Sequence, residues 1–454
     1  MADKSRITNS IKYYDQATDL IPGKTQLISR RASQFAAGVS PVYAESAKGS
    51  KFIDVDGNEY IDWVNAVSAV ILGHSDNVVD TAVKQQIDKG SIYTLNSTME
   101  VELAELLVDT IPSAEMVRYS KGGGEACSVA IRIARGVTGK DKILFSGYHG
   151  WHDWYQSANY LVDPESGEFP FAGIEPIGVP KVLAGTALPF IYGDLKNLEQ
   201  LFNENKGEVA AIMMEPLRSD IPEKGYLEGV QKLAKENNAI LIFDEVSCGW
   251  RTRIGGIQEF LNVTPDMSVF AKAMSNGYPM GVTVGSRDVM EPASEMFISS
   301  SYWSDNVGLA ASITTINELK SRNSEDQFED LGARMRKTID EVISSVGIPA
   351  KSSGFHYRAS LSIDLPDETL RPKINTLFIQ EMAKNGIYSN MGFMPTLSHT
   401  EEDIKKTAEA MEASLKVIQK ALEGDLDNLL AVSYTHLRAH ETDSYLVCRL
   451  LLEK

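Results

Sequence analysis

Two segments decide the fold, AILIFDEVSCGWR (239–251) and PDMSVFAKAMSNGYPMG (265–281). Each contains a short apolar run that leads directly into polar residues: Asp244 and Glu245 in the first segment and Lys272 in the second. Short apolar runs bounded by turn residues are typical of strands buried in a parallel sheet. Ligands of such sheets bind where the strands end, so these three side chains are candidates for a functional site.

Apolar runs at Lys142–Phe145 and Ala210–Met214 continue the pattern, alternating with helical segments over residues 117–285. The alternation predicts an α/β fold with a mainly parallel central sheet and helices on both faces. The stretch 51–64 predicts two short strands around an Asp-Gly turn, and residues 310–345 predict one long helix. We therefore expect an N-terminal arm with short strands over 1–74, a large domain over 75–315 and a smaller α+β domain over 316–431.

The composition is that of a globular protein, with 43% hydrophobic and 23% charged residues. Asp and Glu number 62 and Lys and Arg 44, which gives a net charge of −18. A chain this acidic repels nucleic acids and anionic membrane surfaces, and no apolar run reaches the length of a membrane span. The three cysteines, Cys127, Cys248 and Cys448, form neither a disulfide framework nor a zinc-ligand pattern. We expect a cytoplasmic protein without a metal.

The last residues, VSYTHLRAHETDSYLVCRLLLEK (432–454), resemble the translation of a sequencing adaptor. We expect them to be non-native and to carry no function. The alternative is a native C-terminal helix.

A glycine run opens a helical pattern in YSKGGGEACSVAIRIAR (119–135). Glycines let a backbone approach a ligand closely, and the free N–H groups of a helix N-terminus attract anions. The segment therefore predicts either a phosphate cradle or a plain turn into a helix. It is neither a dinucleotide fingerprint nor a P-loop, because the spacing differs and no Lys-Ser/Thr pair follows. A nicotinamide dehydrogenase is excluded on that ground.

Three further features complete a chemical set. Lys272 follows an apolar run, where a buried amine becomes a usable nucleophile, although a surface lysine is the commoner arrangement. Asp244 ends a strand, where a carboxylate holds a cationic ring nitrogen or stands as an exposed loop acid. The segment GYHGWHDWY (147–155) offers aromatic faces for a planar ring or a packed aromatic cluster. An amine, an acid, an anion cradle and a stacking face are together the requirements of pyridoxal phosphate.

The chain resembles the class III aminotransferases of fold-type I, and within this family the glutamate-1-semialdehyde 2,1-aminomutase-like subgroup. The resemblance covers residues 10–425 and rests on D-E-V-x-x-G-W-R and P-D-x-x-x-x-A-K-x-x-x-N-G-x-P-x-G. It implies that Lys272 forms the Schiff base and shuttles the proton, while Asp244 keeps the ring nitrogen protonated. Val246 and Tyr148 would cover the two ring faces. The expected cofactor-binding set is Gly123, Gly124, Tyr148, His149, Glu215, Asp244, Val246, Lys272 and Ser301.

The resemblance also implies a homodimer, because Ser301 stands where the family usually places a Thr that reaches the neighbouring subunit's phosphate. The chain departs from the family in two segments. The family's Asn-Ser-Gly-Thr-Glu-Ala run is Lys-Gly-Gly-Gly-Glu-Ala here (121–126), so phosphate binding would depend on backbone amides. VNAVSAVILGH (64–74) differs from the mutase-like Ser-Trp-Gly-Pro pattern. Substrate contacts are expected from Arg30, Arg31 and Ser68.

The leading functional prediction is an aminotransferase that uses an amino donor and an oxo or aldehyde acceptor. An intramolecular 2,1-aminomutase is the alternative, and closure of a loop over Gln156–Gly185 could then retain its intermediate. A non-catalytic pyridoxal-phosphate-binding protein is a third class, which the joint presence of Lys272 and Asp244 disfavours.

Overall fold

The computed structural model describes residues 4–161, 175–217, 221–355 and 357–431. The chain divides into two compact units. The central unit is Asn77–Glu325, and the terminal unit joins the described residues up to Asp76 to those from Asp326 onward. The predicted adaptor-derived tail lies outside the described residues, as does the middle of the predicted loop over Gln156–Gly185. The predicted division into arm, large domain and small domain stays a prediction.

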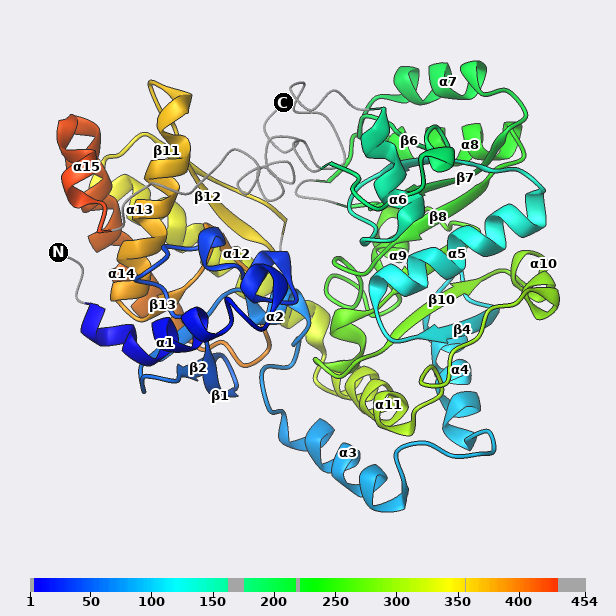
Figure 1. Ribbon diagram of the computed structural model, residues 1–454, viewed down its shortest axis with the longest axis horizontal. Helices are drawn as coiled ribbons and strands as arrows, with labels where there is room; N and C mark the ends of the chain where they lie inside the picture. Colours follow the sequence, from blue (N-terminus) through cyan, green and yellow to red (C-terminus); the bar gives the residue numbers. More distant parts are fainter. Residues whose placement is uncertain (1–3, 162–174, 218–220, 356, 432–454) are drawn as a thin grey trace. The chain divides into compact units, whose positions relative to one another are not determined.

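The central unit is built on one seven-stranded sheet (Figure 1). Its strands are parallel to their neighbours except β10, which runs antiparallel to both β4 and β9. The prediction of a mainly parallel sheet is confirmed. In spatial order the strands are β4 (Met116–Ser120), β10 (Gly281–Gly285), β9 (Met267–Phe270), β8 (Ile240–Asp244), β7 (Val209–Met214), β5 (Lys142–Ser146) and β6 (Ala187–Pro189).

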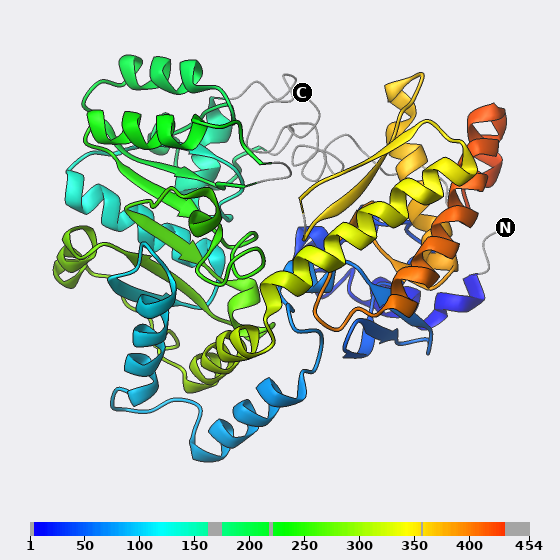
Figure 2. The same cartoon turned by 180° about the vertical axis from the view of Figure 1, so that it is seen from behind.

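Helices cover both faces of this sheet, which Figure 2 shows from behind. Successive side chains of a strand point to opposite faces, and β7 shows the result. Met213 packs with residues of α5 (Gly123–Thr138), whereas Ile212 and Met214 pack with residues of α7 and α8. The other helices of the unit are α3 (Asn77–Lys89), α4 (Thr98–Thr110), α6 (Asp153–Gln156), α7 (Leu195–Glu204), α8 (Tyr226–Glu236), α9 (Ile257–Leu261), α10 (Arg287–Met290) and α11 (Asn306–Ser321).

The terminal unit holds two small antiparallel-rich sheets and the remaining helices. The predicted hairpin of residues 51–64 is present, and β13 joins it in parallel to β3. A buried core around Trp63 and Phe393 links the sheets to the helices. The strands are β1 (Ala44–Lys48), β2 (Lys51–Asp54), β3 (Glu59–Asp62), β11 (Ala350–Ser353), β12 (Ala359–Ile363), β13 (Ile387–Tyr388) and β14 (Gly392–Phe393), and the helices are α1 (Thr8–Gln16), α2 (Asn65–Ser68), α12 (Ser324–Val346), α13 (Arg371–Lys384), α14 (Glu401–Lys420) and α15 (Leu426–Leu429).

The single helix predicted over 310–345 is wrong. Helix α11 ends at Ser321 and α12 begins at Ser324. Between them Asn323 has a φ of 50°, in the left-handed region that Asn tolerates and that terminates helices. The apolar periodicity continues across this break, which is why the pattern indicated one helix. Within the described part of the chain, no helix is both long and apolar enough to cross a membrane.

Candidate active site

Four polar side chains follow the carboxyl ends of neighbouring parallel strands in the central unit. The strands lie in the order β9, β8, β7, β5. Lys272 comes two residues after β9, Asp244 ends β8, Glu215 follows β7, and His149 comes three residues after β5. Because parallel strands end at the same edge of a sheet, the fold gathers groups from distant parts of the sequence.

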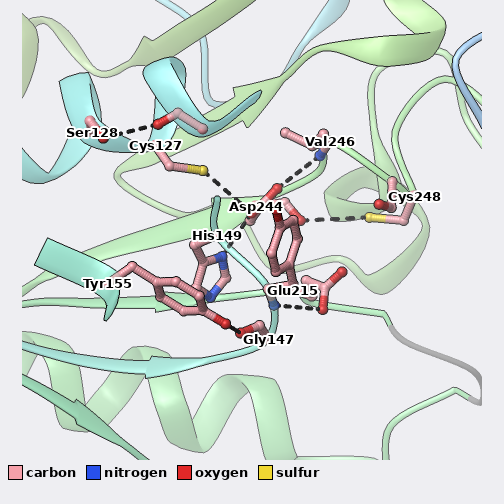
Figure 3. A network of polar contacts seen from close by, with 12 residues as sticks. Cys127, Ser128, Gly147, His149, Tyr155, Glu215, Asp244, Val246 and Cys248 are labelled. Atoms are coloured by element: carbon pink, nitrogen blue, oxygen red, sulfur yellow. Dashed lines mark hydrogen bonds and ion pairs between the residues drawn. The ribbon is translucent and has the colours of Figure 1, made fainter. Parts of the chain in front are cut away.

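Asp244 is the centre of a hydrogen-bonded network (Figure 3). Asp244 as a whole residue is 2% exposed. Its Oδ2 atom accepts from Nδ1 of His149 at 2.7 Å and from Sγ of Cys127 at 3.4 Å, and its Oδ1 atom accepts from the Val246 amide at 3.0 Å. Three donors hold this carboxylate in one orientation. It is therefore an ordered hydrogen-bond acceptor at the strand ends.

His149 belongs to this network and to an aromatic cluster at the same time. Its ring is 1% exposed and lies 5.7 Å from the Tyr155 ring and 6.4 Å from the Trp154 ring, measured between centroids. The Tyr155 hydroxyl donates to the Gly147 carbonyl at 2.8 Å, which secures the loop after β5. His149 is thus packed in an aromatic cluster, whereas Tyr148 is 45% exposed. The stacking of this segment on a planar ring stays a prediction.

Cys127 is a site residue that the sequence did not single out. It lies on the buried face of α5, where a cysteine is indistinguishable from any small apolar residue. Burial raises the pKa of the Cys127 thiol well above its usual range, and the nearby Asp244 carboxylate raises it further. The thiol therefore stays protonated and donates to Asp244. The ligand atoms of Cys127, His149 and Asp244 lie within 4.8 Å of one another, an arrangement that the hydrogen bonds account for.

Lys272 is partly buried between two fully packed alanines, Ala271 and Ala273. Its Nζ atom donates to Oγ of Ser247 at 2.9 Å. Ser247 lies three residues beyond Asp244, so the loop after β8 holds both the acid and the partner of the amine. The backbone of Lys272 has a φ of 47°, which costs about 1 kcal/mol for a residue with a Cβ. Such strain is common at functional positions.

The glycine run packs tightly against the loops that follow β5 and β8. A Cβ on Gly123 would lie 2.8 Å from a methyl carbon of Val246, and one on Gly150 would lie 2.7 Å from the Cα of Gly124. Glycine is therefore required sterically at 123 and 150. No side chain caps α5 at Gly122, so the helix opens with uncapped N–H groups beside Asp244 and Val246.

Glu245 has a different role from Asp244. Its carboxylate accepts from the Ile257 amide at 2.5 Å and from Nε2 of Gln258 at 2.9 Å, which ties β8 to the start of α9. Burial raises the pKa of Glu245 to about 7, and the hydrogen bonds from Gln258 and Ile257 oppose that rise. The sequence made both carboxylates candidates for a functional site. In the structure, the buried Glu245 carboxylate instead connects the end of β8 to the start of α9.

Of two other predicted residues, Glu215 lies at this edge and Ser301 lies on the surface. Glu215 accepts from the Tyr148 amide at 3.3 Å and leaves no room for a Cβ on Gly147. Ser301 lies in an exposed turn shortly before α11. Nearby, Lys121 forms an ion pair with Asp305, and its amide donates to the Glu125 carboxylate at 2.8 Å.

The three predicted substrate residues belong to the terminal unit. Arg30 is exposed, and the guanidinium of Arg31 lies beside Gly23. The Ser68 hydroxyl is buried and donates to the Val67 carbonyl at 2.6 Å. Asn65, Ala66, Val67 and Ser68 all have positive φ values, an unusual run of left-handed residues that includes a β-branched one.

The chemistry of these residues fits pyridoxal phosphate. Asp244 is an ordered carboxylate for a cationic ring nitrogen, Lys272 is a primary amine on the adjacent strand end, and α5 presents an uncapped N-terminus for an anion. The phosphate cradle at the glycine run stays a prediction, because packing alone accounts for the glycines at 123 and 150.

Comparison with known proteins adds independent findings. The family model "Aminotransferase class-III" matches residues 34–415. The chain is 33% identical over 433 residues to the 3-aminobutyryl-CoA aminotransferase of Cloacimonas acidaminovorans, covering 93% of this chain and 100% of that relative. It is also 33% identical over 433 residues to glutamate-1-semialdehyde 2,1-aminomutase 2 of an Exiguobacterium species, covering 91% of this chain and 98% of the relative.

The fold has a similar solved structure, the PLP internal aldimine form of the FumI protein from Sphingopyxis sp. MTA144. The TM-score is 0.82 at 22% identity, over 92% of this chain and 98% of that one. This likeness confirms the predicted fold.

Proposed function

Because this chain belongs to the class III aminotransferase family, we propose specific roles for its residues within that family's chemistry. The chain is a pyridoxal-phosphate-dependent aminotransferase, as the sequence predicts. We propose that Lys272 and Asp244 are its catalytic residues and that it transfers an amino group from a donor to a separate oxo or aldehyde acceptor. The observation that carries the assignment is the parallel pairing of β8 with β9, because the ordered Asp244 carboxylate ends β8 and the Lys272 amine follows β9 by two residues.

The bound cofactor supplies an electron-accepting ring that stabilises negative charge on a substrate carbon. The Asp244 carboxylate would stabilise a positive charge on the ring nitrogen of the cofactor, because three donors fix the orientation of this carboxylate in a buried setting. The Nζ atom of Lys272 takes a proton from one carbon of the substrate and delivers it to a different carbon. Ser247 holds that amine in place through its hydroxyl. Val246 and Tyr148 would hold the ring, and Gly123 and Gly124 would offer amide groups to the phosphate.

The test of this assignment is the variant Lys272→Ala. We expect turnover with any donor to be lost, while the thermal unfolding midpoint stays within a few degrees of the wild type. Ser247→Ala is the matched control, because it removes a partner of the amine but leaves the amine, and we expect a partial loss of turnover. Full turnover in Lys272→Ala would contradict the proposal. A wild-type chain that binds pyridoxal phosphate but turns over no donor would instead support the non-catalytic class.

Intramolecular transfer is a second candidate, favoured by the relatives named glutamate-1-semialdehyde 2,1-aminomutase. The two reactions differ in their need for a second substrate. A panel of amino donors distinguishes them: bleaching of the cofactor band by a donor, and its return with an oxo acid, supports the aminotransferase. Product formation from glutamate-1-semialdehyde alone, with no response to other donors, supports the mutase.

We also propose that the active protein is a homodimer in which Ser301 contacts the cofactor phosphate of the neighbouring subunit. Support comes from the exposed turn that carries Ser301 and from exposed apolar side chains next to it, Phe297 at 87% and Tyr302 at 68%. Analytical ultracentrifugation should give a dimer mass. Ser301→Ala should weaken cofactor binding without changing that mass, and a monomeric active enzyme would contradict the proposal.

A further inference from the structure

Ser301 stands on a short surface segment, residues 296–304, which we call the Ser301 segment. It contains no charged residue, although 23% of the chain is charged. Phe297 is 87% exposed and Tyr302 is 68% exposed. Exposed loops move more than the elements that they connect. The position of the Ser301 hydroxyl therefore depends on the contacts that hold this segment to the rest of the protomer.

Two arginines hold the first half of the segment by its backbone. The guanidinium of Arg118 donates through Nη2 to the Ile298 carbonyl, and the guanidinium of Arg132 donates through Nη1 to the Phe297 carbonyl at 2.9 Å. Arg118 lies on β4 and Arg132 lies on α5. Because the two carbonyls belong to successive residues, the bonds fix two neighbouring peptide planes. They thereby set the direction in which the chain continues toward Ser301.

Guanidinium groups suit this role for two reasons. They stay charged in proteins at every accessible pH, and their N–H groups point in fixed directions within one plane. A hydrogen bond from a charged donor is roughly twice as strong as one between neutral groups. Arg132 is exposed whereas Arg118 is partly buried, so water competes less for the Arg118 bond. We expect Arg118 to contribute more than Arg132.

Packing and charge hold the Ser301 segment at both ends. Ile298 is 4% exposed and belongs to the core that α5 forms with the sheet, and Met296 lies so close to Gly136 that no Cβ fits there. Just beyond the other end, Asp305 caps α11 with its side chain and forms an ion pair with Lys121. The ends of the segment are therefore fixed, while its middle stays exposed.

We propose that Arg118 and Arg132 are positioning residues for the cofactor site of the neighbouring subunit. By fixing the Phe297 and Ile298 carbonyls, they keep Ser301 where it meets the cofactor phosphate across the dimer. The inference rests on the proposed homodimer and on the proposed Ser301 contact. Neither arginine touches cofactor or substrate in this proposal. If the segment is released, Ser301 makes its contact in only a fraction of the molecules, and its contribution to affinity falls accordingly.

The first experiment measures cofactor affinity in a double-mutant cycle. The holoenzyme is dialysed to equilibrium against a range of pyridoxal phosphate concentrations, and the visible band of the bound cofactor gives the dissociation constant. We expect Arg132→Met to raise this constant about three- to tenfold, and Arg118→Met to raise it further, up to the value of Ser301→Ala. Adding Arg132→Met to Ser301→Ala should change it by less than about twofold, because the arginine acts through Ser301.

Arg135→Met is the matched control. Arg135 lies three residues beyond Arg132 on the same helix and donates to the Asp141 carbonyl at 2.8 Å, outside the Ser301 segment. This variant loses the same charge, so we expect the dissociation constant to change by less than about twofold. Arg132→Lys keeps a charged donor and should recover part of the affinity. Additive weakening in the Ser301→Ala and Arg132→Met pair, or equal weakening in Arg135→Met, would overturn the inference.

A mixed dimer shows in which subunit the arginines act. One subunit carries Lys272→Ala and the other carries Arg118→Met, and two different tags allow the mixed species to be purified. The one site with a lysine lies in the Arg118→Met subunit, but it receives the Ser301 segment of the other subunit, whose arginines are intact. We expect this site to bind pyridoxal phosphate with wild-type affinity and the dimer to show about half the wild-type turnover. Affinity as weak as that of the Arg118→Met homodimer would contradict the proposal.

Failure of this inference is distinguishable from failure of the proposed function. A dimer in which Ser301→Ala weakens cofactor binding, while both arginine variants bind as the wild type does, would overturn the inference alone. A monomeric protein, or unchanged affinity in Ser301→Ala, would overturn the proposed cross-subunit contact and the inference with it. The thermal unfolding midpoint shows whether each variant is folded. If Arg118→Met does not fold, Arg132→Met takes its place in the mixed dimer.

Discussion

Replacement of Gly123 by alanine tests the packing between the glycine run and the loop after β8. The new Cβ would lie 2.8 Å from Cγ1 and 3.0 Å from Cγ2 of Val246, whereas carbon atoms in contact prefer about 3.5–4.0 Å. Both methyl groups overlap, so a rotation of Val246 does not relieve the clash. Overpacking of this kind costs about 1–3 kcal/mol, and the gain in helix propensity from Gly to Ala, at most about 1 kcal/mol, offsets only part of it.

We therefore expect Gly123→Ala to lower the free energy of unfolding by about 1–2 kcal/mol. The measurement is urea denaturation of the cofactor-free protein, combined with Val246→Ala in a double-mutant cycle. Val246→Ala removes both methyl groups, so the double variant should recover about 1–2 kcal/mol relative to additivity. Because Val246 is proposed to pack on the ring, Gly123→Ala should also weaken cofactor binding. Unchanged stability, or strictly additive effects, would refute the reasoning.

Three further predictions follow from buried polar groups. Cys127→Val removes one donor to Asp244 at similar volume, so turnover should fall about two- to tenfold while the fold is kept; unchanged turnover would show that the thiol is dispensable. Burial raises the pKa of Glu245 from 4.5 to about 7. The contribution of this group to the free energy of unfolding is therefore fully present below pH 4.5, and about 3 kcal/mol of it is lost as the pH rises through 7. Glu245→Gln should flatten the pH dependence of the unfolding midpoint in that range. Burial lowers the pKa of His399 from 6.5 to about 4. The contribution of this group to the free energy of unfolding is therefore fully present above pH 6.5, and about 3 kcal/mol of it is lost as the pH falls through 4. His399→Gln should remove this loss of stability in acid.

Much of the fold was predictable because it depends on local pattern. Apolar runs marked the four strands that carry the candidate site, and the turn signal at 55–58 marked the hairpin. The helix break at Asn323 was missed, because an apolar stripe continues across it and a single Asn is a weak signal in one sequence.

The site was predictable in its outline and unpredictable in its connections. Lys272 and Asp244 could be chosen from their places at strand ends. Cys127 and Ser247 could not, because a cysteine on the buried face of a helix looks like any small apolar residue and a serine in a loop carries no periodic signal. His152 stood inside an aromatic segment that had two readings, and only the structure shows its ring against Gly124.

The sequence by itself determined which segments become strands and helices, and which polar side chains stand at strand ends, because both follow from the spacing of apolar residues along the chain. The tertiary structure alone decided which of those groups meet. Asp244 and Glu245 are neighbours in sequence, yet one joins His149 and Cys127 and the other joins α9, since successive strand residues point to opposite faces. His149 is 95 residues from Asp244 and Cys127 is 117 residues from it. Contacts over such distances depend on the order of strands in the sheet, which the crossovers set and no local pattern records.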